Sequence, residues 1–306
     1  MSVIIPTHNR SKELRRVLES LQSQNYPHSN FEIIVIDDGS SDDTRDVVEN
    51  FRCGTDIVTK CHFQNHEGPG AARNRGLAWS CGEIVFFCND DTLCGIDLLY
   101  QHDSLHRKLS GIAVLGSVVW DEEIHPNTFM RFLDREGIQF HFNTIKDIHN
   151  ARFNHFYTAN VSLEKKWFDD VKFSTIFKYA AFDDLEVALA LEKKGLKIIY
   201  NKDAIVYHSH YYTPEQYYQR MFSAGTNAIL LRNKYKYDVG ALIKIYSAFM
   251  PFMYFPMGLC LFNIIFGYLS KSKAIEYASL EMHWFLNITY YYSQGMLEKI
   301  NDKRDI

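Results

Sequence analysis

The alternation of strand and helix signals over the first ~120 of 306 residues constrains the fold most strongly. Repeated strand–helix units favour an α/β fold, with a mostly parallel sheet covered by helices on both faces. Short apolar runs predict strands at Val3–Ile5, Ile33–Ile36, Asp56–Thr59, Ile84–Phe87 and Ile112–Val119. Helical periodicity predicts helices from Ser11, from about Asp42, over 70–80 and near 95–109.

Polar motifs follow these strands, at the edge where such sheets bind ligands. They are Pro6-Thr7-His8-Asn9-Arg10, Asp37-Asp38-Gly39-Ser40, the segment 68–76 with its glycines and arginines, and Asn89-Asp90-Asp91. Carboxylates at the end of a buried strand can hold a divalent cation, and that cation can hold a diphosphate. Taken alone, each motif also fits an ordinary turn or helix cap.

Composition narrows the class of protein. Hydrophobic residues make up 46% of the chain, which is ample for a core, and the net charge of −4 gives no basic excess for nucleic acid. The six cysteines form no Cys-x-x-Cys pair, so we expect reduced thiols. The opening residues are interrupted by Pro6 too early for a secretory signal, which favours a cytoplasmic protein.

In this order, the four motifs resemble family-2 glycosyltransferases of the GT-A fold, a Rossmann-like α/β architecture. The resemblance covers roughly residues 2–210. It implies a GT-A domain over 1–210, with a nucleotide-binding half at 1–91 and an acceptor and catalytic half at 92–210. It also implies inverting transfer of a sugar from a nucleotide-sugar, most often a UDP-sugar, to a hydroxyl. The acceptor is left open among saccharides, lipid-linked saccharides and proteins, with cell-envelope polysaccharide or glycolipid synthesis favoured.

The resemblance also assigns roles on the donor side. The implied nucleotide-binding residues are Pro6, Thr7, Arg10, Asp37, Asp38, Arg73 and Asp90. Asp91 would bind Mn²⁺ or Mg²⁺ between the two phosphates. The family often has Asp-x-Asp where this chain has Asn89-Asp90-Asp91, so one charge near the metal is absent.

Three segments of the second half complete the expected site. The run from Phe182 to Glu186 resembles the family's acidic segment and places the catalytic base at Asp184, although acidic residues also stabilise a helix start through its dipole. Asp183 and Asn160 would contact donor or acceptor. His208, with His210 as second choice, would complete the metal site, but a lone histidine is often structural.

Residues 211–306 predict a helical, aromatic-rich extension. Its segment 245–270 carries no charge and is long enough to cross a bilayer, but Pro251 and Pro256 interrupt it. Three alternatives remain open for this segment: an interfacial or re-entrant membrane contact, a core or homodimer contact, and a helix that spans the membrane. With a membrane contact, the protein would lie peripherally at the inner face of the membrane.

Two alternatives compete with the transferase. A membrane-bound scaffold with a decayed transferase domain would explain the departures at Asn89 and Asp183. A sugar nucleotidyltransferase usually has a glycine-rich loop after the first strand, where this chain has Pro-Thr-His-Asn-Arg. A dinucleotide dehydrogenase is disfavoured because no Gly-x-Gly-x-x-Gly follows that strand.

Overall fold

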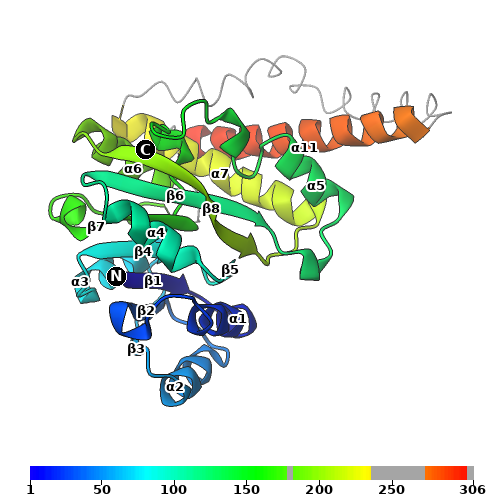
Figure 1. The fold of residues 1–306 in the computed structure, drawn as a ribbon. Helices are drawn as coiled ribbons and strands as arrows, with labels where there is room; N and C mark the ends of the chain where they lie inside the picture. Colours follow the sequence, from blue (N-terminus) through cyan, green and yellow to red (C-terminus); the bar gives the residue numbers. More distant parts are fainter. Residues whose placement is uncertain (178–181, 236–272, 302–306) are drawn as a thin grey trace. The chain divides into compact units, whose positions relative to one another are not determined.

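The computed structural model describes residues 1–177, 182–235 and 273–301 (Figure 1). Its described part contains an eight-stranded sheet in the order β3-β2-β1-β4-β7-β6-β8-β5. The strands are β1 (Ser2–Thr7), β2 (Glu32–Asp37), β3 (Val58–Phe63), β4 (Ile84–Cys88), β5 (Thr92–Cys94), β6 (Ile112–Trp120), β7 (Asn160–Glu164) and β8 (Lys197–His208). The α-helices in the described ranges are α1 (Ser11–Gln22), α2 (Thr44–Gly54), α3 (Pro69–Trp79), α4 (Leu98–His106), α5 (Thr128–Arg135), α6 (Asp183–Lys193), α7 (Pro214–Tyr235) and α11 (Lys273–Asn301).

The expected α/β class and mostly parallel sheet are confirmed. The pairs β1–β2, β2–β3, β1–β4 and β6–β8 are parallel, whereas β7 and β5 introduce antiparallel pairings. The expected boundaries of β3 were wrong: the strand starts at Val58 and continues to Phe63, because all six residues pair with β2. Strand β8 is continuous over Lys197–His208, and its register with β6 shifts between Gly116 and Ser117.

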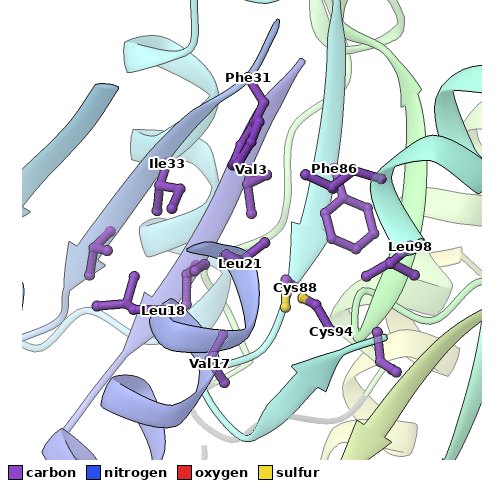
Figure 2. Packing of buried hydrophobic residues seen from close by; sticks show 14 of the residues in the cluster. Val3, Val17, Leu18, Leu21, Phe31, Ile33, Phe86, Cys88, Cys94 and Leu98 are labelled. Carbon is purple, nitrogen blue, oxygen red and sulfur yellow. The ribbon is translucent and has the colours of Figure 1, made fainter. Parts of the chain in front are cut away.

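The central strands are buried on both faces, which explains their continuous apolar sequences. On one face, Val3 and Ile5 pack with Leu14 and Leu18 of α1, in the cluster that Figure 2 shows. On the other face, Ile4 packs in a second cluster that includes residues of α3 and α6. Alternate residues of β1 therefore pack into two clusters, one under α1 and the other under α3 and α6.

The strand β7 was missed in a region that the sequence left irregular. Polar and apolar residues alternate along the strand, and both kinds are buried: Asn160 and Ser162 as well as Val161 and Leu163. Their partner is His102, which lies 2.8 Å from Ser162 Oγ through Nδ1 and 2.9 Å from Asn160 Oδ1 through Nε2. The Asn160 amide also donates to the carbonyl oxygens of Ser117 and Ala204, at the register shift between β6 and β8.

The chain divides into two compact units, one of residues 1–126 and 134–211 and the other of 127–133 and 212–306. In the second unit, α7 and α11 cross closely, because a Cβ added at Gly225 would lie 1.9 Å from the carbonyl oxygen of Tyr292. Phe129 and Trp284 contact each other edge to face in the same unit. The domain boundaries expected from the sequence stay a prediction.

Within the described ranges, no helix has the length and apolarity needed to span a bilayer. The segment 245–270, on which the membrane, dimer and spanning alternatives depend, lies outside the described residues.

We expect Gly76→Ala to destabilise the protein by about 1–3 kcal/mol, as overpacking a core does. A Cβ at this position in α3 would lie 2.4 Å from Cγ2 of Ile4, a fully buried and stiff β-branched side chain. Gly54→Ala at the end of α2 is the matched control, since a Cβ there has no atom within 4 Å. Urea unfolding midpoints measure both; equal midpoints for the two variants would contradict the close packing of α3 on β1.

Candidate active site

The candidate site lies where the parallel strands β1, β2 and β4 end. The residues that follow these strands include Arg10, Asp38 and the acidic pair Asp90-Asp91. Strand β5 then pairs antiparallel with β8, with Thr92 opposite His208, and the backbone N–H of Ser209 donates to the carbonyl oxygen of Asp91 at 2.8 Å. The topology therefore brings His208 beside Asp91, the two residues to which the resemblance assigned a metal.

Asp90 and Asp91 are both buried and share a guanidinium. Arg10 Nη1 contacts Asp91 Oδ2 and lies 3.3 Å from Asp90 Oδ1. Burial by itself would raise the pKa of Asp91, but His208 and Arg10 outweigh it and hold this pKa well below its usual range. Burial raises the pKa of Asp90 to about 7, with Asp91 adding to the rise and Arg10 opposing it. At neutral pH, Asp91 is thus the fully charged member of the pair.

The residues around Asp91 have the donor chemistry of a divalent-cation site. Asp91 Oδ2 lies 3.6 Å from His208 Nε2 and 3.9 Å from His210 Nδ1, while Asp91 Oδ1 is buried without a hydrogen-bond partner. Two ligands at about 2.1 Å from an ion are about 3.0–3.6 Å apart at angles of about 90–120°, so Asp91 and His208 fit. In the described part of the chain, no three His, Cys, Asp or Glu side chains are placed to hold a metal by themselves. Further ligands would therefore have to come from a bound molecule.

Arg73 links three elements inside the site. Its side chain is buried, and its Nη1 lies 2.5 Å from Asp183 Oδ2 at the start of α6. Its Nη2 lies 3.4 Å from Asn89 Oδ1, just after β4. The resemblance assigned Arg73 to nucleotide binding and Asp183 to contact with donor or acceptor. In the structure, these two side chains form an ion pair with each other. Asn89, the departure from Asp-x-Asp, serves as an acceptor for Arg73.

Asp184 lies next to this ion pair and is partly buried. Burial and the neighbouring Asp183 raise the pKa of Asp184 to about 6, against the opposing charge of Arg73. The residue before α6, Phe182, has a φ of 69°, a left-handed conformation that costs energy for a bulky side chain. A carboxylate of this pKa is suited to accept a proton near neutral pH.

The two aspartates after β2 shape the loop around them. Asp38 accepts hydrogen bonds from the backbone N–H groups of Glu67 and Gly68, both at 2.8 Å, and from Gln64 Nε2 at 2.8 Å. Asp37 Oδ1 accepts from the backbone N–H of Ser40 at 2.8 Å. Both carboxylates are buried. In this structure they organise the segment before α3.

Two histidines that the sequence analysis left without a role lie over Asp38. The rings of His8 and His66 are 4.3 Å apart, and the Nδ1 atoms face the carbonyl oxygen of Asp38 at 2.8 and 3.1 Å. Because a carbonyl oxygen only accepts, each Nδ1 must donate. His8 lies in the motif Pro6–Arg10 after β1, but its contact with His66 depends on the tertiary fold.

The remaining expected residues fall in different environments. Pro6 and Thr7 form the last two positions of β1, opposite Ile36 and Asp37, and Thr7 is buried. Asn160 is fully buried in the core, with its amide hydrogens on backbone carbonyls and its carbonyl oxygen on His102. The structure therefore places Asn160 in the core, where its side chain links β7 to α4, β6 and β8.

Parts of this chain are similar in sequence to known proteins. A 92-residue stretch is 42% identical to the GalNAc(5)-diNAcBac-PP-undecaprenol beta-1,3-glucosyltransferase of Campylobacter jejuni, and covers 30% of this chain and 29% of that protein. A 90-residue stretch is 39% identical to the poly(ribitol-phosphate) beta-N-acetylglucosaminyltransferase TarS of Staphylococcus aureus, and covers 29% of this chain and 16% of TarS. The matched stretches thus span less than a third of either relative.

Solved structures show the same fold over most of the chain. The mannosyltransferase PcManGT from Pyrobaculum calidifontis, solved with GDP-Man and Mn²⁺, superposes with a TM-score of 0.68 at 16% identity, covering 99% of this chain and 87% of that one. S. aureus TarS 1-349 in complex with UDP superposes with a TM-score of 0.55 at 18% identity, covering 100% of this chain and 91% of that one.

The family model described as glycosyl transferase family 2 matches residues 2–184, which is more than half of the chain. This range contains β1, β2 and β4 with the polar segments that follow them, and it ends at Asp184. The chain therefore belongs to glycosyl transferase family 2.

Proposed function

We propose that this protein is an inverting, metal-dependent glycosyltransferase that moves a sugar from a nucleoside-diphosphate sugar, favouring a UDP-sugar, to an acceptor hydroxyl. The observation that carries the proposal is the buried link through Arg73. This residue joins Asn89, beside the acidic pair, to Asp183, beside the base candidate Asp184. A donor-binding end and a proton-accepting end are thus parts of one site.

The donor end is built from Asp91, His208 and Arg10. Asp91 and His208 would hold Mn²⁺ or Mg²⁺, which when bound supplies charge neutralisation for a departing diphosphate. Arg10 carries a permanent charge beside them and can donate charge-assisted hydrogen bonds to phosphate oxygens. We place Pro6, Thr7, Asp37, Asp38 and Asp90 around the nucleotide as lining and loop-shaping residues.

Asp184 supplies the acid–base chemistry. Its carboxylate accepts the proton of the acceptor hydroxyl as the oxygen bonds to the anomeric carbon. The bond from that carbon to the diphosphate breaks on the opposite side, so the configuration inverts. The pair between Asp183 and Arg73 positions the start of α6, and therefore Asp184.

We propose the class of acceptor from the names of two relatives. By their names, the C. jejuni relative acts on a undecaprenol-linked glycan and TarS on poly(ribitol-phosphate). We infer a cell-envelope glycan acceptor, with the enzyme at the cytoplasmic face of the membrane. The role of 245–270 in that contact, and a homodimer, remain predictions.

The intact ion-pair network weighs against a decayed scaffold. Asn89 and Asp183 were its only support, and both are bonded to Arg73 in the site. Each of the two departures therefore has a structural partner in the site, and neither is evidence of decay.

A nucleotide screen tests the donor class. We expect one nucleoside diphosphate, UDP first, to raise the melting temperature in the presence of Mn²⁺ but far less with EDTA, because ligands that bind the native state stabilise it. Asp91→Ala should abolish the metal-dependent part of the shift. Equal shifts with and without metal in the unmodified protein would contradict metal-dependent donor binding.

Asp184→Asn should lower the rate of sugar transfer by at least ~10²-fold, as loss of a general base does. The dissociation constant for nucleotide should stay within about threefold. Asp170→Asn makes the same change at an exposed aspartate that pairs with Lys194, and should leave the rate unaltered. Near-normal turnover in Asp184→Asn would remove this residue from the role of base.

The pH profile should report the raised pKa of Asp184. A base acts when deprotonated, so kcat/KM should fall about tenfold per pH unit below pH ~6 and level off above it. Because the pKa of Asp90 is also raised, to about 7, the profile of Asp90→Asn serves as the control. The fall near pH 6 should persist in that variant; its disappearance would assign the titration to Asp90.

A further inference from the structure

One oxygen of Asp91 faces three cationic or metal-ligating groups. Asp91 Oδ2 contacts Arg10 Nη1, and the same atom lies 3.6 Å from His208 Nε2 and 3.9 Å from His210 Nδ1. Of the two Asp91 oxygens, Oδ2 is the one whose 3.6 Å distance to His208 Nε2 suits an ion held by both residues. The guanidinium of Arg10 therefore occupies the position from which an ion would contact Asp91 Oδ2. Its positive charge also repels a second cation there.

Arg10 cannot leave this position by losing its proton, because an arginine stays charged at all ordinary pH values. An incoming anion that offers it charge-assisted hydrogen bonds would draw it away. The side chain of Arg10 is 34% exposed, whereas those of Asp90 and Asp91 are 10% and 7% exposed. The guanidinium is thus the partner that a bound anion can reach more readily, and the carboxylates are more deeply buried.

We propose that Arg10 is a counterion latch, which holds Asp90 and Asp91 in the nucleotide-free protein and keeps a divalent cation out until a diphosphate draws the guanidinium away. The inference rests on the proposed function and adds the order of events at its donor end. The diphosphate satisfies Arg10 by charge-assisted hydrogen bonds, and the released Asp91 oxygen becomes available to the ion. Metal and nucleotide then bind together.

The latch gives Arg10 two effects of opposite sign. Removing its charge should strengthen the binding of a cation to the free protein and weaken the binding of the nucleotide. A residue that only stabilises the fold would not produce this pair of effects. By linkage, UDP must raise the affinity for Mn²⁺ by the same factor by which Mn²⁺ raises the affinity for UDP.

Manganese titrations followed by the electron paramagnetic resonance signal of free Mn²⁺ test the latch. The proteins are the unmodified chain, Arg10→Gln and Arg15→Gln, each with and without saturating UDP. Arg15 is the matched control, because it is an exposed arginine in α1, the helix that begins directly after Arg10. Melting temperatures check that each variant is folded, and Arg10→Lys, which retains a positive charge, is the second variant.

Without nucleotide, Arg10→Gln should bind Mn²⁺ at least about tenfold more tightly than the unmodified chain, since a charge a few ångströms away has been removed. UDP should enhance Mn²⁺ binding less in this variant than in the unmodified chain. Arg15→Gln should match the unmodified chain, and Arg10→Lys should fall between it and Arg10→Gln.

Two results would contradict the latch proposal, and they differ in what they imply for the proposed function. Unchanged or weaker Mn²⁺ binding by Arg10→Gln in the absence of nucleotide refutes the latch, while UDP-dependent Mn²⁺ binding by the unmodified chain would keep the proposed function. Failure of the unmodified chain to bind Mn²⁺ even with UDP refutes both the latch and metal-dependent donor binding.

Discussion

The buried pair between Arg73 and Asp183 is the interaction on which the rest of the site depends. It ties α3 to the start of α6 and, through Asn89, to the end of β4. A buried ion pair adds little net stability, but breaking one by removing a single partner leaves an uncompensated charge and is costly. The pair therefore fixes the geometry of three elements more than it strengthens the fold.

Around this pair, the fold gives identical side chains different properties. Asp91 is kept charged by its cationic neighbours, whereas burial raises the pKa of Asp90 to about 7 and that of Asp184 to about 6. A charged carboxylate suits a cation, and one titrating near neutrality suits proton transfer. The proposed division between donor binding at Asp91 and acid–base chemistry at Asp184 thus follows from the different environments of these carboxylates.

Much of the fold was predictable because its signals are local. The apolar runs of β1, β2, β4 and β6 and the period of α1 mark buried elements in a single sequence, and the motifs at the strand ends indicate the candidate site. The rest depends on partners distant in sequence. Strand β7 is hydrogen-bonded to His102, about 60 residues before it, and Arg73 pairs with Asp183, which lies 110 positions further along the chain. Neither sequence spacing nor periodicity encodes such pairings.

A crystal structure of the protein with UDP and Mn²⁺, measured at the manganese absorption edge, tests the central claim most directly. The account predicts one anomalous peak within coordination distance of Asp91 and of diphosphate oxygens, with Arg10 moved from Asp91 to the phosphates. UDP bound without manganese at Asp91, or manganese bound away from the ends of β4 and β8, would contradict it.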